Sequence, residues 1–565
     1  MTISMKTSWR SMLVWCVLCR GVWAADAVPG EKLVPPDTGL FFTLRDIPEC
    51  VQLIQQTQTG AMLRDPVFAK FLQQIGQTLE QSAAQVKAEV GLTPHEILGL
   101  FQGQVTFALI ERPTRKLGLT LIVGLGDRFS EAQRLIRKLE ERMDAEGEVT
   151  RETRAIEDAR VQVIQLPQQG NETPWTHIAY TLYEKYWILS TEVEALREVV
   201  KRVHSQNEES LADNEVYRYI LKQCGAEKPA PLAHYFINPV GVFRSLVSIF
   251  QDQVPQAGLA IGLLPILGLD KFKGFGGTLD LAQGEFDAVE KVFFYVEQPP
   301  TGILGMFNFP AGELAPPDWV PGHVAGYTAL NWDVQEAYRA VEALFDTFQG
   351  MGSLSRILDS MAVTEGNGIH PKKDLIDSFE GRVDIVFPAE SQSGNSFPLS
   401  MALKLKDSQR LERVLKMLAE RGDLPITQQS VNGHTLYKFE ADDANMHLAI
   451  SKGVLLISFE ENTLRTMLEG ASNQPLSQAA DYQKIARHFP SKVSIVSFFN
   501  SESSFVQIFQ ALQEQENSPL NNLPADLDLP KPEEIEAALK KYLRPSGGYC
   551  APDRRGALMV YYTLK

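Results

Sequence analysis

Few residues in this sequence combine the types and the spacing that known site chemistry requires. The nine histidines are scattered, and no two of them stand four residues apart, the spacing that puts two ligands on one helix face. His434 and His447 could meet across a predicted hairpin, with Asp442 and Asp443 between them. Because a zinc site needs three or four ligands, ordinary surface positions are the favoured interpretation, and we predict no metal site.

Two glycine-rich segments lack the features of a phosphate-binding loop. The segment Gly124–Gly126 is expected between a strand and a helix, but Phe129 takes the place of the third glycine of G-x-G-x-x-G. The favoured interpretation is a tight turn with Ser130 capping the helix. The segment Gly274–Gly277 is expected to precede a strand, so no helix N-terminus would face an anion there. We therefore predict no cofactor.

Catalytic groups are equally scarce in the sequence. Ser353 lacks the following glycine that a strained nucleophile elbow uses. The nearest approach to a convergent set of ionisable side chains is formed by Asp333, His370, Lys372 and Lys373. A solvated loop is the favoured interpretation for these four residues, because ionisable residues close in sequence are ordinary on loops. We predict no catalytic residue.

The predicted helices and strands that would position a site occur twice along the chain, in two similar sets of segments. The segment Phe101–Gly103 returns as Phe379–Gly381, and the predicted strand Tyr186–Ser190 returns as Val454–Ser458. Further pairs follow in the same order: Leu33–Phe41 with Trp319–Tyr327, Leu135–Arg142 with Val414–Arg421, Phe236–Asn238 with Phe498–Asn500, and Val292–Val296 with Met559–Thr563. This collinear order predicts two tandem homologous copies.

Each copy is predicted to be an α+β unit with a largely antiparallel sheet. Apolar and alternating runs indicate strands, for example at Val105–Ile110 and Leu117–Val123. The predicted helices separate groups of strands instead of alternating with them, which disfavours a parallel sheet. We place the first copy at residues 33–298, a proline-rich interdomain linker at residues 299–318, and the second copy at residues 319–565.

The two copies are expected to differ in one helical stretch. In the first copy, apolar residues at helical spacing predict a long helical stretch over Asp65–Gly91. Its counterpart in the second copy, Val334–Met361, is shorter and is broken by Gly350 and Gly352.

The composition is typical of a globular protein, with more acidic than basic residues. The chain has 565 residues, of which 44% are hydrophobic and 22% charged, so a sizeable core is expected. With 54 Lys and Arg against 70 Asp and Glu, the net charge is −16. This charge opposes binding to nucleic acid, and we predict no nucleic-acid partner.

The N-terminus has the plan of a secretory signal peptide. Two basic residues are followed by the apolar run Met12–Cys19 and by small residues at Ala24 and Ala25, so we assign residues 1–25 to a cleaved leader. The alternative is an uncleaved anchor, but the apolar run is far shorter than the roughly 20 residues that span a bilayer.

Two further features concern the mature chain. Its longest apolar stretch, Ala257–Leu269, is also too short to span, and a buried helix is favoured over a lipid-facing segment. Three cysteines remain after the leader, Cys50, Cys224 and Cys550, so at most one disulfide can form, and its pairing is open.

Several of these segments also resemble a known family. Leu33–Thr38, Leu63–Pro66, Phe101–Gly103, Leu267–Thr278 and the pair Trp332-Asp333 resemble a family of uncharacterised exported bacterial proteins with a duplicated α+β domain, a domain-of-unknown-function family. The resemblance implies secretion and a duplicated architecture. It implies no reaction, cofactor or catalytic residue.

Duplication without a catalytic signature leads to our functional prediction. We expect an exported, non-enzymatic envelope protein, periplasmic or extracellular, that binds or scaffolds a partner protein or peptide. One alternative is a hydrolase with a site in the interdomain cleft. The other is a carrier of lipid or another apolar ligand, suggested by Ala257–Leu269. The mature chain should have no transmembrane segment, and peripheral association with the envelope is compatible with the sequence.

Overall fold

The computed structural model describes most of the predicted mature chain. The described residues are 28–69, 99–111, 117–146, 150–166, 175–205, 207–226, 230–250, 257–364, 368–389, 399–421, 425–431, 433–440, 445–470, 474–501 and 532–565. The predicted leader at residues 1–25 and most of the helical stretch predicted over Asp65–Gly91 lie outside them. Export therefore stays a prediction.

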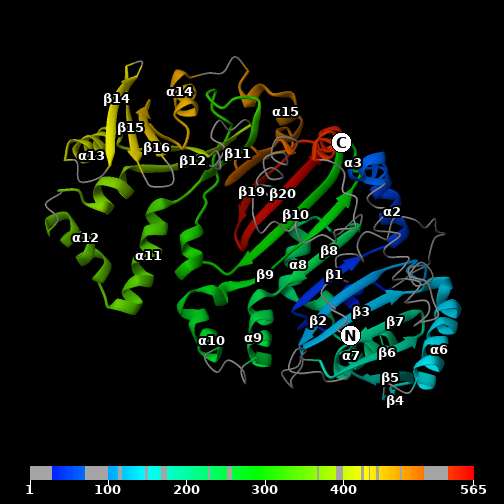
Figure 1. Ribbon diagram of the computed structural model, residues 1–565. Coiled ribbons are helices and arrows are strands. Elements are labelled where there is room, and N and C mark those ends of the chain that lie inside the picture. Colours follow the sequence, from blue (N-terminus) through cyan, green and yellow to red (C-terminus); the bar gives the residue numbers. More distant parts are fainter. Residues whose placement is uncertain are drawn as a thin grey trace.

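The described part of the chain forms one 20-stranded sheet in which every pair of neighbouring strands is antiparallel (Figure 1). The first ten strands are β1 (Leu40–Leu44), β2 (Val105–Glu111), β3 (Leu117–Gly124), β4 (Arg151–Ile156), β5 (Ala159–Gln165), β6 (His177–Tyr183), β7 (Tyr186–Ser190), β8 (Ala233–Ile237), β9 (Phe272–Leu281) and β10 (Phe286–Val296). The others are β11 (Val324–Asn331), β12 (Phe379–Pro388), β13 (Ser400–Leu405), β14 (Ile426–Val431), β15 (His434–Glu440), β16 (Asn445–Ser451), β17 (Val454–Ser458), β18 (Ile495–Phe499), β19 (Ser546–Asp553) and β20 (Gly556–Leu564).

The strand order of the first ten strands is repeated by the second ten. Read across the sheet, the first half runs β4-β5-β6-β7-β3-β2-β1-β8-β9-β10, and the second half runs β14-β15-β16-β17-β13-β12-β11-β18-β19-β20. The halves meet where β10 pairs with β20. Even the turns between β6 and β7 and between β16 and β17 match, because Glu184 and Lys452 both have positive φ.

This repeated order supports the predicted tandem duplication. The α+β class with a largely antiparallel sheet is confirmed. Descent of the two halves from one duplicated unit, and the domain boundaries placed at residues 33–298 and 319–565, stay predictions.

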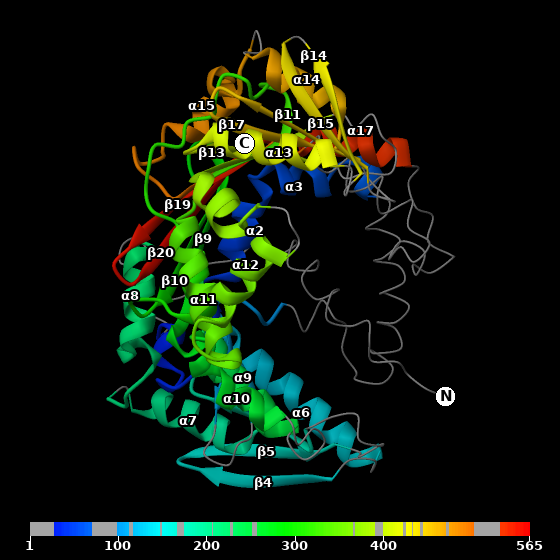
Figure 2. The same ribbon diagram turned by 90° about the vertical axis from the view of Figure 1, so that its left-hand side faces the viewer.

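Helices cover both faces of the sheet (Figure 2). The helices of the first half are α2 (Ile47–Gln55), α3 (Gln58–Leu63), α6 (Phe129–Glu146), α7 (Val193–His204), α8 (Glu215–Gln223), α9 (Pro239–Phe250) and α10 (Ala257–Ile266). Those of the second half are α11 (Val334–Gln349), α12 (Ser353–Thr364), α13 (Ser408–Arg421), α14 (Glu461–Glu469), α15 (Ala480–Ala486) and α17 (Pro532–Tyr542). Figure 2 shows α8 and α15 on one side of the strands and α2, α9 and α12 on the other.

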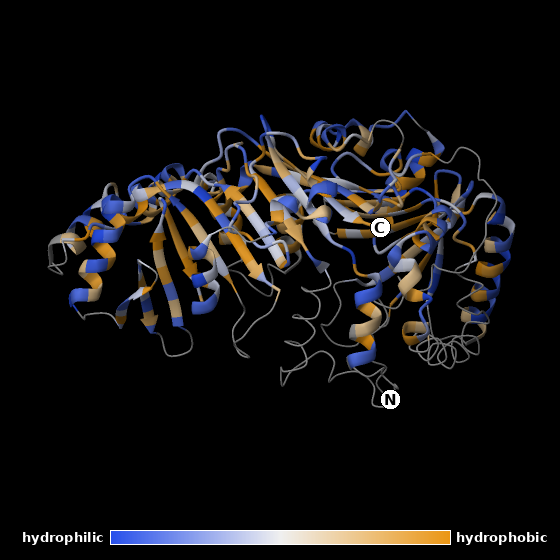
Figure 3. Cartoon of the chain, turned by 90° about the horizontal axis from the view of Figure 1, so that it is seen from above, coloured by the Kyte–Doolittle hydropathy of each residue, from blue (hydrophilic) through white to orange (hydrophobic). Residues whose placement is uncertain are grey.

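Separate apolar clusters hold these helices to the strands. The largest cluster lies beneath α7 and α8, and it includes Phe41, Leu196 and Ile220. The helices α6 and α13, which hold the same place in the two halves, each have a cluster of their own. Seen from above, the strands form one curved layer in which hydrophobic residues recur along each strand (Figure 3).

The segment between the halves is packed against its neighbours. It contains a 3-10 helix, η7 (Gly302–Phe307), which contacts α11. Further along, the backbones of Gly312 and Val493 bond to each other at 2.9 Å in both directions. The proline-rich linker predicted at residues 299–318 is therefore not irregular throughout, because η7 forms in the nine residues between Pro300 and Pro310.

Three local predictions need correction. The segment Gly274–Gly277 lies inside β9 instead of preceding a strand. Its glycines allow the neighbouring strand to approach closely, since a Cβ on Gly276 would stand 2.3 Å from the Tyr235 carbonyl oxygen. Ser130 does not cap α6, since the helix already begins at Phe129. Finally, the favoured burial of Ala257–Leu269 is wrong: α10 packs only one side, and Leu259 is 71% exposed.

The break predicted in the helical stretch of the second half is confirmed. Gly350 and Gly352 both have positive φ, and they separate α11 from α12. The carboxylate of Asp346 accepts hydrogen bonds from the backbone N–H groups of Gly352 and Leu354, which fixes this turn.

Candidate functional site

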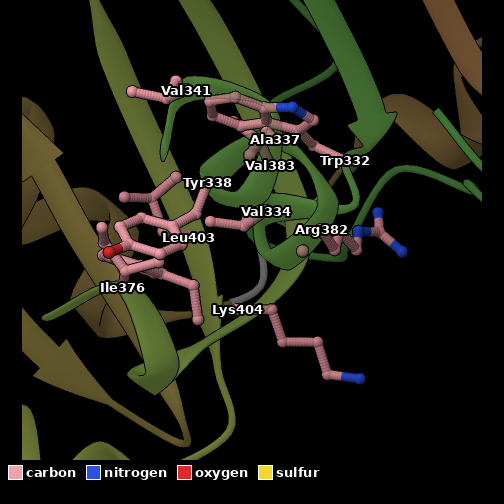
Figure 4. A pocket seen from close by; sticks show the side chains of 12 residues that line it. Trp332, Val334, Ala337, Tyr338, Val341, Ile376, Arg382, Val383, Leu403 and Lys404 are labelled. Carbon is pink, nitrogen blue, oxygen red and sulfur yellow. The ribbon is translucent and has the colours of Figure 1, made fainter. Parts of the chain in front are cut away.

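An apolar pocket of about 360 Å³ lies between α11 and the strands β12 and β13 (Figure 4). Its volume falls within the range of roughly 300–1,000 Å³ that is usual for small-molecule sites. The lining is almost entirely carbon: the side chains come from Trp332, Val334, Ala337, Tyr338, Val341, Ile376, Phe379, Val383 and Leu403, with the stems of Arg382 and Lys404. The pocket is therefore suited to an apolar ligand.

A bulge in β12 opens this space. Between Phe379 and Val383 the register of β12 against β13 shifts, so that four steps along β12 match two along β13. Gly381 lies in the bulge with φ of +119°, and a Cβ there would stand 2.4 Å from the carbonyl oxygen of Trp332. Only glycine fits this close approach, which joins the strand to the start of α11.

Trp332 and Asp333 fix the start of α11 beside the pocket. The Asp333 carboxylate caps the helix by accepting a hydrogen bond from the backbone N–H of Glu336 at 3.0 Å. The indole N–H of Trp332 donates to the carbonyl oxygen of Met306 in η7 at 2.8 Å. The indole is thereby anchored against η7 at one side of the pocket (Figure 4).

Tyr338 forms a buried wall, and its polar end is satisfied. Its hydroxyl donates to Glu342 at 3.1 Å, and the Lys372 ammonium lies 5.2 Å from the ring centroid. Burial and the hydrogen bond to Glu342 raise the pKa of Tyr338. The hydroxyl is therefore a hydrogen-bond donor and not a base at neutral pH.

A buried network of charged groups supports the strand behind the pocket. The Arg382 guanidinium contacts Asp384 at 2.9 Å, and Asp384 also accepts a hydrogen bond from the Tyr327 hydroxyl at 2.6 Å. Burial opposes the charge of Arg382, but the ion pair with Asp384 outweighs it and raises the pKa of the guanidinium. Burial and the neighbouring Asp384 carboxylate raise the pKa of Tyr327 well above its ordinary value.

One accessible charge pair stands at the pocket. The Lys404 ammonium contacts Glu380 at 2.8 Å, and both side chains are about half exposed. Figure 4 shows the charged ends of Arg382 and Lys404 extending away from Tyr338. The arrangement thus presents an apolar interior with cations at its edge, and it brings no nucleophile together with a base among the lining residues.

The four ionisable residues singled out in the sequence are each engaged locally. Asp333 caps α11, His370 contacts Asp359 at 3.0 Å, and Lys372 pairs with Asp377 at 3.0 Å. The backbone N–H of Lys373 donates to the ring of His370 at 3.4 Å. Asp333 lies beside the pocket as the cap of α11, and Lys372 contacts the pocket wall through the ring of Tyr338.

The prediction that His434 and His447 could meet is wrong. In the hairpin of β15 and β16, His447 stands opposite Lys438, and His434 pairs with Val431 on the other side of β15. His447 is buried, which lowers the pKa of its imidazole, and the nearest acid, Glu461, lies 4.0 Å away. Within the described residues, no group of three or more His, Cys, Asp or Glu residues is placed to hold a metal ion.

The remaining candidates have structural roles. Gly126 has positive φ in a tight turn between β3 and α6, and the Ser353 hydroxyl donates to the Gln349 carbonyl oxygen at 2.9 Å. None of the three cysteines of the described chain forms a disulfide. Burial raises the pKa of Cys224 to about 12 and that of Cys550 to about 11, so both thiols are unreactive.

Comparison with known protein families finds a match for the N-terminal part of the chain. Residues 26–244 match the family described as "Protein of unknown function (DUF3352)". The predicted resemblance to a domain-of-unknown-function family is thereby confirmed. The matched DUF3352 region ends within α9, so the pocket at α11 lies beyond it.

Two other comparisons add little. No curated protein matches this sequence. A solved structure titled "Structure of crystal form III of TP0453" aligns over 45% of this chain and 80% of its own, at 11% identity and a TM-score of 0.23. This similarity is too low to indicate a shared fold or function.

The sequence did not predict the pocket, although several of its lining residues belong to segments with a recognisable pattern. Trp332 belongs to the family resemblance, Phe379 and Gly381 to a repeat, and Val334 to a predicted helical stretch. The repeat carried a usable signal, because a glycine that recurs after a phenylalanine indicates a backbone position with a special requirement. The apolar lining carried no signal, since apolar residues at helical spacing predict core and not cavity.

Proposed function

We propose that this protein is an exported, non-enzymatic envelope protein that binds the apolar chain of a lipid or fatty acid in the α11 pocket. One observation carries the proposal: a pocket of about 360 Å³ between α11 and β12, lined by carbon and bordered by Arg382 and Lys404. Burial of an acyl chain there would contribute roughly 0.8 kcal/mol per methylene group.

The charges at the edge favour an amphiphile with an acidic head group. The Lys404 ammonium is already held by Glu380, and both side chains remain accessible to solvent. An exposed ion pair contributes little, about 0–1 kcal/mol, so a ligand carboxylate or phosphate can compete with Glu380 for Lys404 at small cost.

The other two predicted functions have weaker support. A hydrolase needs convergent ionisable groups, and Asp333, His370 and Lys372 are instead paired with separate partners. Binding of a partner peptide would use the strands β4 and β14, which each pair with one described neighbour only. Exposed polar side chains cover both of these strands, which opposes strand addition. The partner function stays a prediction.

Displacement of a fluorescent fatty-acid analogue by unlabelled palmitate tests the proposal. The purified full chain should bind the analogue, and Ala337→Phe, which places a ring in the pocket, should weaken binding at least tenfold. Ala343→Phe is the matched control, because Ala343 is an exposed residue of the same helix and does not line the pocket. It should bind like the parent.

Two outcomes would overturn this function. One is a parent protein that does not bind the analogue at all. The other is equal affinity in the parent, Ala337→Phe and Ala343→Phe, which would place the ligand elsewhere. Thermal unfolding of both variants checks that each remains folded.

A further inference from the structure

The helix α10 has an unusual composition for a helix at a protein surface. Its ten residues, Ala257–Ile266, are all Ala, Gly, Leu, Ile or Pro, so no side chain carries a polar group. A helix that is apolar on every side is normally enclosed by protein or by lipid. This one is enclosed on one side only.

Most of the surface of α10 faces open space. Leu259 is 71% exposed, and Leu263 and Ile266 are exposed as well, while Leu264 is buried. A Cβ added at Gly258 or at Gly262 would meet no atom within 4 Å. The open side therefore runs the whole length of the helix, and it is not the result of one misplaced leucine.

The apolar surface continues onto neighbouring elements. The partner helix α9 contacts α10 and exposes Phe243 and Leu246. Directly after the end of α10, the Leu267 carbonyl oxygen accepts a hydrogen bond at 2.9 Å from the backbone N–H of Ile303 in η7. The helix η7, which exposes Phe307, contacts α11 in turn.

We propose that α9 and α10 dock the protein on a lipid bilayer, with Leu259, Leu263 and Ile266 inserted among the acyl chains. No helix in the described part of the chain has the length and apolar content to cross a membrane. Ten helical residues reach about 15 Å, half of the roughly 30 Å hydrocarbon core, so α10 lies in the boundary of one leaflet.

The charge of this region fits a lipid surface. Acids outnumber bases in the chain as a whole, yet Arg244 on α9 is the sole charged residue in the described segments 239–250 and 257–269. Arg244 is exposed at the edge of the apolar surface, although its charge also acts on Glu111. A cation beside exposed leucines suits a lipid phosphate above the acyl chains.

A protein partner fits this surface less well. Protein interfaces combine aromatic anchors with a rim of hydrogen-bonding groups that gives specificity. On α10 neither is present, because its side chains are aliphatic and without donors or acceptors. The neighbouring α9 adds one exposed aromatic ring, Phe243, and one charged group, Arg244, but among the described residues no rim of hydrogen-bonding groups surrounds α10. Bilayers demand no such specificity. The inference goes beyond the proposed ligand binding and does not depend on it.

Flotation with lipid vesicles tests the docking. Because apolar insertion drives it, the purified full chain should float with vesicles of pure phosphatidylcholine and should stay bound in 0.5 M sodium chloride. Each exposed leucine should contribute about a factor of ten to the partition coefficient. The double variant Leu259→Asp, Leu263→Asp should therefore lower it roughly a hundredfold.

Controls separate this inference from ligand binding in the pocket. The variant Ala337→Phe should float like the parent, and the double aspartate variant should still bind the fatty-acid analogue. Since Leu259 and Leu263 are exposed, the double variant should keep the thermal transition of the parent.

Results of three kinds would overturn the docking. In the first kind, the membrane binding expected of α10 is missing: either the parent does not float with phosphatidylcholine vesicles, or the double variant floats equally well. In the second, binding requires phosphatidylglycerol and is lost in salt, which would indicate attraction between charges instead of insertion. In the third, light scattering shows a dimer that the double variant dissociates, which would make α10 an interface between two copies.

Discussion

The turn after the first strand differs between the two halves of the sheet by one residue. In the first half, the backbone N–H of Arg45 bonds to the Leu232 carbonyl oxygen, and the next residue, Asp46, caps α2. In the second half, Asn331 makes the corresponding bond to Ser494, but Trp332 stands between it and the capping residue Asp333. The additional residue is the one that borders the pocket.

The second strand of each half differs as well. In the first half, β2 pairs with β1 and with β3 without any shift of register. The corresponding strand β12 shifts against β13 in the bulge that contains Gly381. The pocket thus lies where the second half departs from the repeated pattern: Trp332 is an additional residue, and β12 is irregular against β13 and also against β11. The order of the strands and the helix cap stay the same.

The largest difference between the halves should appear when their two corresponding glycines are replaced. Gly381→Ala places a Cβ 2.4 Å from the Trp332 carbonyl oxygen at a φ of +119°, so we expect a loss of about 4 kcal/mol in unfolding free energy. Gly103→Ala places its Cβ 3.2 Å from the Gly124 carbonyl oxygen, and φ is not positive there. Its cost should be about 1 kcal/mol or less.

Chemical denaturation followed by tryptophan fluorescence measures both variants. If Gly103→Ala proved as costly as Gly381→Ala, the bulge would not be the special feature of the second half. Gly381→Ala should also fail to bind the fatty-acid analogue, whereas Gly103→Ala should bind it like the parent.

A smaller contrast is expected from the buried polar contacts between the first two strands of each half. In the second half, Asp384→Asn removes the charge that balances Arg382, and we expect a loss of about 3 kcal/mol. In the first half, the hydroxyls of Thr43 and Thr106 lie 2.9 Å apart, and Thr106→Val should cost about 1 kcal/mol. Urea denaturation measures both unfolding free energies. Equal losses in Asp384→Asn and Thr106→Val would show that the buried Arg382 does not need the Asp384 carboxylate to balance its charge.

Much of this fold could be predicted from the sequence, because repetition and alternation are local signals. The recurrence of Tyr186–Ser190 as Val454–Ser458 matched two strands, β7 and β17, at corresponding places in the sheet. Helix breaks at Gly350 and Gly352 were also visible, since glycine at a helix end marks a turn.

The site could not be predicted in the same way. The pocket depends on how far α11 stands from β12, and this distance is set by the position of Trp332 against η7 and by the bulge at Gly381. Neither is encoded in periodicity. The exposure of α10 was missed for a related reason: an apolar run predicts burial, and only the packing of α9 and η7 decides which side stays uncovered.

The smallest expected effect concerns two carboxyls at the junction of the halves. Asp287 in β10 is buried, which raises its pKa, although Lys565 and Arg544 act in the opposite direction. Its Oδ2 accepts a hydrogen bond from the backbone N–H of Gln58 at 2.7 Å. Two residues earlier, the Glu285 side chain is 34% exposed, and its contacts with Arg487 and His488 lower its pKa.

The two carboxyls should therefore respond to pH with opposite signs. For Asp287 the folded protein holds the proton more tightly, so its contribution to stability falls as pH rises above the ordinary value of 3.8. Asp287→Asn, which keeps an acceptor for Gln58, should raise the unfolding free energy at pH 7 by about 1 kcal/mol or less and have no such effect below pH 3.8. For Glu285 the stabilising contribution is present above the ordinary value of 4.5 and is lost as pH falls through its lowered pKa. Thermal melts of Asp287→Asn and Glu285→Gln between pH 3 and 7 measure both, and a shift of the same sign in the two variants at pH 7 would mean that burial does not distinguish them.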